Sequence, residues 1–291
     1  MGDTAATLTL PDGRTLGYAR WGPSDGRPVF HCHGIPSCRL DGVPGDDEVC
    51  AATGTQVVTV DRPGVGLSDP KPTRRLIDWP EDLAALADAL GFERFGILGW
   101  SAGSPFALAC AARLPERVTA VALVAPPAPV EHAGDVDQFG RRAYFRIALA
   151  APWLMSAAFR PLVPLARLSS RLATEIVWLG SSKPEMEIVR GAERRAAMAS
   201  TTPQMLRQGA GGIVEDMKLV TKPWGFDLDE IRARVLIWHG DADSFVPRES
   251  SEHLVARLPD CRLIPCPGEG HFLIYERIEE ILSTFTTAGS D

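Results

Sequence analysis

Residues 99–103 have the pattern Gly-x-Ser-x-Gly, which places Ser101 at a point where it could act as a nucleophile. A five-residue pattern is a weak signal by itself, because its meaning depends on the elements around it. Here the apolar run 95–98 before it predicts a buried strand, and residues 101–114 after it predict a helix. A tight strand-to-helix turn holds its serine in a strained backbone conformation above unpaired helix N–H groups. The alternative is an ordinary strand–helix junction with an incidental serine.

A serine hydroxyl needs a general base near neutral pH, and the base needs a partner that orients it. Among six histidines, His271 is the best candidate, because it lies in a glycine-rich loop between the last predicted strand and the last predicted helix. His239 ends a strand, and we expect it to pack in the core or to support the following loop. His132 and His253 are expected at the surface or in an inserted segment.

Two aspartates compete for the role of orienting acid in the segment 239–247, which follows the predicted strand 235–238. Asp243 lies farther along the loop and closer to the start of the next helix. Asp241 could instead cap or brace the turn. The residues alone leave both candidates open.

The sequence His31-Cys32-His33 could suggest a metal site. However, alternate residues of a strand point to opposite faces, and no fourth ligand is in view. We therefore expect no metal and no organic cofactor.

The composition excludes several classes of protein. The chain has 291 residues, 45% of them hydrophobic and 23% charged, as expected for a globular protein with a large core. A net charge of −7 disfavours nucleic acid and anionic membranes as main partners. No apolar run reaches the ~20 residues of a membrane span. Residues 147–159, the nearest run, are interrupted by Pro152 and could lie on a membrane surface or pack in an inserted segment.

The compartment is predicted from the cysteines and the N-terminal residues. Six scattered cysteines form no Cys-x-x-Cys pair, and Cys32 and Cys110 sit in apolar runs where a thiol acts as a small hydrophobe. The first ten residues lack the pattern of a secretory signal. These features predict a reducing, cytoplasmic location.

Alternating strands and helices predict an α/β fold with a mostly parallel sheet covered on both faces. A hairpin is expected around the turn at residues 11–13, and Asp78 is expected to cap a helix that ends at Gly91. Further strands are predicted at 28–32, 56–60, 118–124 and 262–264, and further helices at 248–258 and 272–285.

The alternation stops between residues 131 and 230, where helical segments are broken by prolines. We interpret residues 131–230 as a helical cap inserted into a core formed by 1–130 and 231–291; a second small domain or an oligomer interface is the alternative. The segment also contains three tryptophans, Trp153, Trp178 and Trp224. They could line an apolar substrate pocket or simply pack within the segment. The pairs Arg141-Arg142 and Arg194-Arg195 could meet a substrate carboxylate or lie on a solvated surface.

Five segments in this order resemble the α/β-hydrolase superfamily over nearly the whole chain: 33–36, 61–68, 99–103, 239–243 and 270–272. The resemblance implies a serine hydrolase with Ser101 as nucleophile, Asp243 as orienting acid and His271 as general base. It also implies that the backbone N–H groups of Ile35 and Ala102 form the oxyanion hole.

Differences between this sequence and known branches of the superfamily argue against some of the activities found in those branches. Epoxide hydrolases and haloalkane dehalogenases carry Asp at the position of Ser101. Proline iminopeptidases usually show His-Gly-Gly-Pro-Gly, which residues 33–37 lack. Residues 222–226 resemble a segment of a poorly described branch of capped hydrolases.

The predicted reaction is acyl transfer to water, on a carboxylic ester, thioester or lactone that is small to medium in size and partly hydrophobic. A proline-iminopeptidase-like peptidase is one alternative; an acyltransferase, cyclase or lyase that uses the same triad is another. A non-catalytic ligand-binding member is the third alternative. The partner is a small molecule, with no nucleic acid and no stable membrane insertion, and the protein is expected to be a monomer or homodimer.

Overall fold

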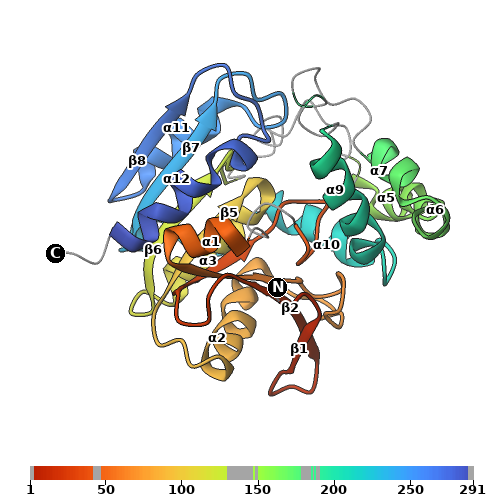
Figure 1. The fold of residues 1–291 in the computed structure, drawn as a ribbon, viewed down its shortest axis with the longest axis horizontal. Helices are drawn as coiled ribbons and strands as arrows, with labels where there is room; N and C mark the ends of the chain where they lie inside the picture. The colour runs from red at the N-terminus through yellow and green to blue at the C-terminus, as the bar shows by residue number, and fades with distance from the viewer. Residues whose placement is uncertain are drawn as a thin grey trace.

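An eight-stranded sheet with the order β1-β2-β4-β3-β5-β6-β7-β8 forms the centre of the protein (Figure 1). The computed structural model describes residues 3–41, 47–129, 147, 150–177, 185, 187 and 191–287. β1 and β2 pair antiparallel with each other, and β2 also pairs antiparallel with β4, whereas the six strands from β4 to β8 are parallel. The strands are β1 (Ala6–Thr9), β2 (Thr15–Trp21), β3 (Arg27–Cys32), β4 (Thr55–Val60), β5 (Phe95–Trp100), β6 (Val118–Val124), β7 (Arg234–Gly240) and β8 (Cys261–Cys266).

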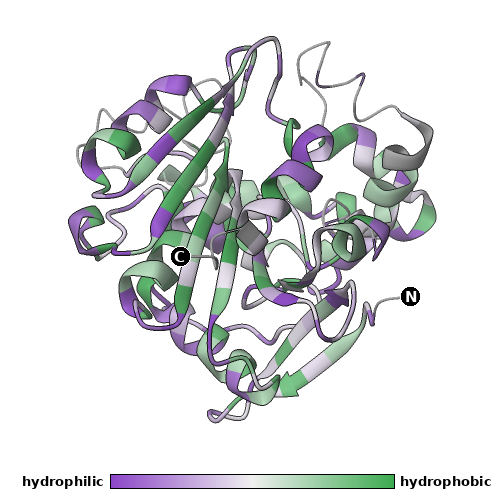
Figure 2. Ribbon diagram, turned by 60° about the vertical axis from the view of Figure 1, so that its left-hand side comes forward, coloured by the Kyte–Doolittle hydropathy of each residue, from purple (hydrophilic) through white to green (hydrophobic). Residues whose placement is uncertain are grey.

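The central strands are apolar on both sides because helices cover both faces of the sheet. Successive strand residues point to opposite faces. Val29 and Phe30 of β3 accordingly enter two different apolar clusters, as do Leu98 and Ile97 of β5. Strands at the centre of the sheet are largely green in the hydropathy view of Figure 2. A central strand of this sheet therefore requires a mostly apolar run.

Five helices pack on the sheet. The cluster with Phe30 contains residues of α2, α3 and α11, and the cluster with Val29 contains residues of α1 and α12. These helices thus form two layers, one on each face. Their bounds are α1 (Asp47–Thr53), α2 (Trp79–Ala89), α3 (Ser104–Arg113), α11 (Arg248–Arg257) and α12 (Ile274–Thr287), with short 3₁₀ turns η1 (Leu76–Asp78), η2 (Ser101–Gly103) and η4 (Leu228–Glu230).

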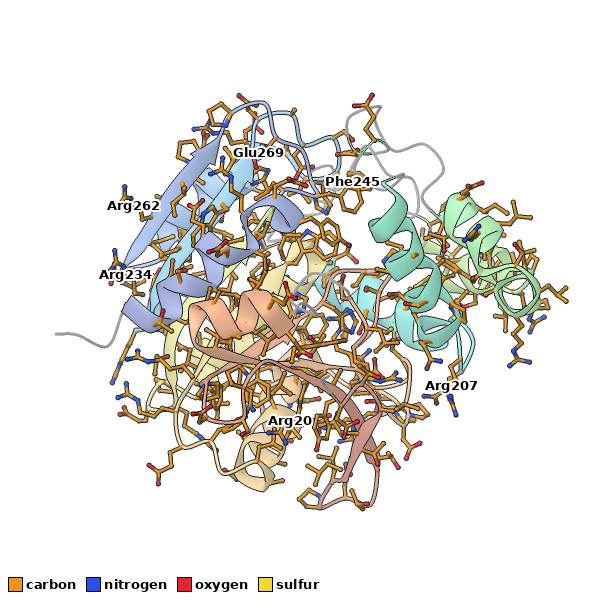
Figure 3. The ribbon with its side chains drawn as sticks, viewed as in Figure 1. Arg20, Arg207, Arg234, Phe245, Arg262 and Glu269 are labelled. Atoms are coloured by element: carbon orange, nitrogen blue, oxygen red, sulfur yellow. The ribbon has the colours of Figure 1, made fainter. Side chains whose placement is uncertain are left out.

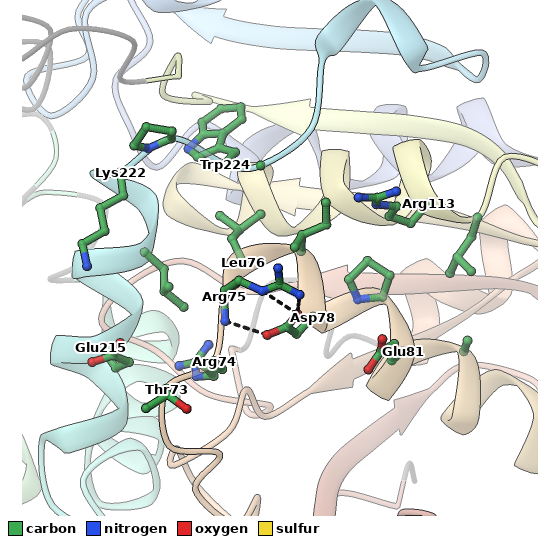
Figure 4. A pocket seen from close by; sticks show the side chains of 17 residues that line it. Thr73, Arg74, Arg75, Leu76, Asp78, Glu81, Arg113, Glu215, Lys222 and Trp224 are labelled. Atoms are coloured by element: carbon green, nitrogen blue, oxygen red, sulfur yellow. Dashed lines mark hydrogen bonds and ion pairs between the residues drawn. The ribbon is translucent and has the colours of Figure 1, made fainter.

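The predicted fold class, hairpin and strands are confirmed, but the predicted cap of α2 is wrong. Asp78 makes no side-chain capping bond to α2. Its carboxylate instead accepts hydrogen bonds from the backbone and guanidinium of Arg75, at 2.8 Å from the Arg75 N–H. The arginine three residues earlier competes for the carboxylate and turns it toward η1 (Figure 4).

Five helices occupy the described part of the segment between β6 and β7: α5 (Pro152–Phe159), α6 (Leu162–Leu168), α7 (Ser170–Val177), α9 (Ala192–Met205) and α10 (Gly211–Val220). They share a third apolar cluster that includes Met155, Met205 and Ile213. In Figure 1 they lie beside the sheet rather than on its two covered faces. The domain boundary at 131–230 stays a proposal.

The two tryptophans of this segment that the structure describes, Trp153 and Trp224, differ in burial. The side chain of Trp153 is 72% exposed, and Trp224 is buried in the same core cluster as α2 and α3. Trp178, Arg141 and Arg142 lie outside the described residues, as do the side chains of Arg194 and Arg195. Within the described residues, no helix combines the length and the apolar character needed to cross a membrane.

Candidate active site

Ser101 lies at the sharp turn between β5 and α3 that the sequence predicts. Its φ angle is +52°, in the left-handed region that a residue with a Cβ rarely adopts. The two glycines of the motif make this turn possible: a Cβ on Gly99 would lie 2.8 Å from the Ser104 Cα, and one on Gly103 would meet the carbonyl oxygen of Cys32. The strain is therefore held in place by close backbone packing on both sides of the serine.

The structure brings Ser101, His271 and Asp243 together. The Ser101 Oγ lies 2.9 Å from His271 Nε2, and His271 Nδ1 lies 2.8 Å from an oxygen of Asp243. A carboxylate only accepts hydrogen bonds, so Nδ1 carries the imidazole proton and Nε2 is free to accept the serine proton. This is the arrangement in which a histidine can act as a general base toward a hydroxyl.

Asp243 is held by its own loop. Its Oδ1 accepts the backbone N–H groups of Phe245 and Val246 at 2.7 and 2.9 Å, which leaves Oδ2 for His271. Burial opposes ionisation of this carboxyl, but the facing imidazole and the hydrogen bonds hold its pKa below its ordinary value. The carboxylate is thus charged at neutral pH and can stabilise an imidazolium.

Aromatic rings fix the position of the His271 side chain, which is buried. The Phe245 ring stacks on the imidazole with centroids 4.6 Å apart, and the Trp100 indole N–H donates to the His271 carbonyl at 3.2 Å. In Figure 3, Phe245 and Glu269 lie at one end of β7 and β8, and Arg234 and Arg262 at the other. The site therefore occupies the carboxyl end of the parallel strands, where α/β sheets place their ligands.

The second candidate acid, Asp241, contacts a different partner. Its Oδ1 accepts the Gly268 N–H at 2.7 Å, and so it braces the loop that leads to His271. His239 supports the acid loop, as predicted: its Nε2–H donates to the Val246 carbonyl at 3.0 Å, and its Nδ1 accepts from Ser251 Oγ at 2.6 Å. Neither residue takes the place of Asp243 beside His271.

Ile35, the first predicted oxyanion donor, lies in a loop after β3. Within the described part of the chain, its N–H donates to no protein acceptor. The carbonyl oxygen of Gly34, which belongs to the same peptide group, accepts from His33 Nδ1–H at 2.8 Å and from Arg62 Nη2 at 3.1 Å. Ala102, the second predicted donor, is buried in the middle of η2, the turn that precedes α3.

A buried ion cluster lies behind this loop, and sequence reasoning did not single it out. Arg62 Nε donates to Asp216 of α10 at 2.7 Å, and Arg74 donates to the other oxygen of the same carboxylate. All three side chains are at most 4% exposed. The available signal was a buried strand followed by two charged residues, Asp61 and Arg62, in the segment 61–68 that carried the family resemblance.

A second buried carboxylate was also missed. Glu185, from the segment between β6 and β7, accepts hydrogen bonds from the Ser244 N–H and Oγ at 3.2 and 2.7 Å. Ser244 follows Asp243 directly, so this segment touches the acid loop. A single glutamate in a stretch without a clear pattern gave no signal of this contact.

A separate cavity of about 750 Å³ lies between η1, α2 and α10 (Figure 4). Arg75, Leu76, Lys222 and Trp224 are among its lining residues. Residues 222–225, which belong to the segment that resembles a branch of capped hydrolases, thus line this cavity. None of the predicted catalytic residues does so.

Comparison with known proteins agrees with this architecture. A family model described as alpha/beta hydrolase fold matches residues 27–152. A non-heme chloroperoxidase of Streptomyces lividans is 35% identical over 153 residues, which cover 50% of this chain and 54% of that protein. A 2-hydroxy-6-oxo-6-phenylhexa-2,4-dienoate hydrolase of Burkholderia cepacia is 27% identical and covers 78% of this chain and 74% of its own.

The fold is shared over the full length with solved structures. The structure of a hydrolase from Pseudomonas aeruginosa PA01 superposes with a TM-score of 0.71 at 19% identity, and it covers 98% of both chains. The sheet order, the helices on both faces and the strand-to-helix turn at Ser101 define an α/β hydrolase fold. The chain thus has the alpha/beta hydrolase fold that the resemblance predicted, and the family model of that description matches part of it, residues 27–152.

Proposed function

We propose that this protein is a serine hydrolase that cleaves a carboxylic ester, thioester or lactone through an acyl-enzyme on Ser101. The observation that carries the proposal is the continuous path from Ser101 Oγ through His271 to Asp243, at 2.9 and 2.8 Å. Hydrolase names among the relatives, such as that of the Burkholderia cepacia protein, support the same class of reaction.

The reaction follows from these contacts. Ser101 Oγ attacks the substrate carbonyl carbon while His271 Nε2 takes the hydroxyl proton, and Asp243 stabilises the imidazolium. The N–H groups of Ile35 and Ala102 donate to the resulting oxyanion, and one such donor is typically worth about 10²–10³ in rate. His271 then gives its proton to the leaving group. Water, deprotonated by His271, cleaves the acyl-enzyme and frees Ser101.

The surroundings of Ile35 favour a substrate with an apolar part. Ile35 packs between the sheet core and the apolar cluster of the inserted helices. We propose that residues 131–230 form a cap beside the site. The residues invoked need no metal or organic cofactor. The cytoplasmic location and a monomeric or homodimeric state stay predictions.

A fluorophosphonate probe and a series of p-nitrophenyl esters test the proposal. We expect the probe to add to Ser101, located by peptide mass spectrometry, and to inhibit ester hydrolysis in parallel. Ser101→Ala should lose labelling and at least about 10³-fold in kcat. The matched control is Ser104→Ala, which removes a nearby hydroxyl that donates to the Gly99 carbonyl instead of His271.

The alternatives predict different results. Faster release of proline from a dipeptide than of any acyl group from an ester would favour a peptidase. Transfer of the acyl group to an added alcohol in single-turnover product analysis would favour an acyltransferase. Absence of any adduct on correctly folded wild-type protein would favour a ligand-binding protein.

A further inference from the structure

The loop after β3, residues 33–41, contains the proposed oxyanion donor Ile35 and is called the oxyanion loop. Arg62 lies behind this loop and donates two hydrogen bonds to it. Its Nη1 contacts the His33 carbonyl oxygen at 2.7 Å, and its Nη2 contacts the Gly34 carbonyl oxygen at 3.1 Å. The side chain is 1% exposed, so these are charge-assisted hydrogen bonds in a dry environment. Such bonds are stronger than the same contacts at a surface.

The peptide group that receives the second bond is the one that donates to the oxyanion. The Gly34 carbonyl and the Ile35 N–H belong to one amide. A donor on its oxygen draws electron density from its nitrogen and strengthens the N–H as a donor. His33 Nδ1–H occupies the other side of the same oxygen at 2.8 Å. The amide is therefore polarised from two directions and cannot rotate without breaking both bonds.

The guanidinium itself is held rigidly. Asp216 accepts from its Nε at 2.7 Å, and its Cζ lies 4.7 Å from the centre of the Phe106 ring. The positive charge also reaches the strand before the loop: burial, with the charge of Arg62 second, lowers the pKa of His31 to about 3 and that of His33 well below its ordinary value. Both imidazoles are thus neutral, and Arg62 faces the oxyanion loop from behind as a buried cation.

We propose that Arg62 is a positioning residue for catalysis: it fixes and polarises the Gly34–Ile35 peptide group that donates to the oxyanion. The inference rests on the proposed function, because it concerns the transition state of that reaction. It assigns to α10 an indirect role, since Asp216 of that helix aims the guanidinium. Arg62 itself touches no substrate.

Arg74 offers a matched control. It donates to the same carboxylate and to the Pro63 carbonyl, and no bond joins it to the oxyanion loop. Arg62→Met and Arg74→Met each remove one buried arginine from Asp216 and leave it the other. Loss of a buried ion pair is common to both variants, whereas loss of the contacts to the His33 and Gly34 carbonyls occurs in Arg62→Met alone.

The first measurement is steady-state hydrolysis of p-nitrophenyl butyrate by the full-length protein. We expect Arg62→Met to lower kcat about 10–100-fold with KM changed less than about threefold, because the lost interaction strengthens in the transition state. Arg74→Met should keep kcat within about threefold of wild type. Equal losses in the two variants would assign Arg62 a structural role and overturn the inference.

The second measurement reports the oxyanion directly. A trifluoromethyl ketone forms a hemiketal with the catalytic serine, and ¹⁹F NMR gives the pKa of its hydroxyl. We expect Arg62→Met to raise this pKa by about one unit or more, which is a tenfold loss of oxyanion stabilisation. Arg74→Met should leave it unchanged. A pKa equal to that of wild type in the Arg62 variant contradicts the proposal.

Arg62→Lys covers the case in which Arg62→Met does not fold. Lysine keeps the charge but lacks the planar fork that reaches two carbonyls. We expect a smaller loss in kcat and a smaller rise in the hemiketal pKa; wild-type values for both would overturn the inference. If fluorophosphonate labels the wild-type protein and the Arg62 variants keep wild-type kcat and hemiketal pKa, this inference alone is refuted. Unlabelled wild-type protein refutes the proposed function and the inference with it.

Discussion

The two sides of the candidate site are held in different ways. The acid–base side consists of the loops at residues 240–247 and 266–273, and the oxyanion side consists of the loops at 33–41 and 61–68. On the acid–base side, the Asp243 carboxylate is fixed by N–H groups two and three residues farther along its own loop. A short segment can therefore orient the Asp243 carboxylate, although Glu185 and Trp100 also reach this side from distant parts of the chain.

The oxyanion side depends on side chains from α9 and the chain that follows it. Arg62 reaches Asp216, and Thr201 Oγ donates to the Leu40 carbonyl at 2.8 Å. The Gln208 side chain donates to the carbonyls of Gly66 and Ser68 at 3.0 and 2.7 Å. The glycines at 64 and 212 also bring the backbones of the loop and of α10 into close contact.

The Asp243 carboxylate is thus oriented mainly by residues close to it in the sequence, whereas the oxyanion side is held mainly by side chains from distant segments. Changes in α9 and α10 should affect oxyanion stabilisation, with little effect on the His271–Asp243 pair. The following predictions test this division.

The largest effect is expected on the acid–base side. Asp243→Asn keeps the shape of the side chain but removes the charge that stabilises the imidazolium and presents a donor where His271 needs an acceptor. We expect kcat to fall by about 10⁴-fold. Esterase assays under saturating substrate measure this effect.

Asp241→Asn is the matched control. An asparagine oxygen can still accept the Gly268 N–H that Asp241 binds, so we expect less than about a tenfold change in kcat. A larger loss of kcat in Asp241→Asn than in Asp243→Asn would show that Asp241, and not Asp243, is the acid that orients His271.

The sequence predicted the local half of the site better than the tertiary half. Ser101, Asp243 and His271 follow predicted strands, and the carboxyl ends of parallel strands meet at one edge of a sheet. The alternation of strands and helices likewise predicted the fold class. The fold class and the candidates Ser101 and His271 needed only motifs, periodicity and the order of the segments, whereas the choice of Asp243 over Asp241 came from the family resemblance.

The contacts that the sequence could not predict join segments far apart in the chain. Arg62 and Asp216 are separated by 154 residues, and nothing in either segment indicates the other. Glu185 reaches the acid loop from a stretch without a clear pattern. The exposure of Trp153 was missed for a related reason: residue type indicates a preference for burial, but only packing decides which side of a helix is covered.

The buried ion pair between Arg39 and Asp61 on the oxyanion side is expected to contribute strongly to the free energy of unfolding. Asp61 accepts the backbone N–H of Arg39 at 2.6 Å, the guanidinium of Arg39 at 3.0 Å and the Leu67 N–H at 2.8 Å. Asp61→Asn leaves the Arg39 charge buried without its carboxylate. We expect the free energy of unfolding, measured by urea titration, to fall by about 3–5 kcal/mol.

Asp78→Asn is the surface counterpart. Asp78 pairs with Arg75, whose side chain is 76% exposed, so the same change of charge should alter stability by no more than about 1 kcal/mol. Similar losses in both variants would show that the long-range pair on the oxyanion side contributes no more than an exposed pair.

A pH dependence of stability is also expected on the oxyanion side. Burial raises the pKa of Asp41 to about 7, against hydrogen bonds from Ser37 and the Gly34 N–H and the charge of Arg62, which lower it. Because the folded-state pKa lies above the unfolded value of 3.8, folding favours the protonated carboxyl. This contribution to stability is complete below about pH 4 and is lost as the pH rises toward 7.

Comparing wild type with Asp41→Asn isolates that group, since the amide does not titrate and other groups cancel in the difference. Urea unfolding at pH 5, 6, 7 and 8 gives the free energy of unfolding of both proteins. We expect the value for the variant to rise relative to wild type by about 1 kcal/mol per pH unit up to pH 7 and to rise no further above pH 7. The Asp243 loop gives no such rise, because the pKa of its carboxyl is lowered and that carboxyl is already charged over this range. A difference that stays flat from pH 5 to 8 would mean that Asp41 is ionised in the folded protein, and that the oxyanion side holds a buried negative charge beside the Gly34 N–H throughout.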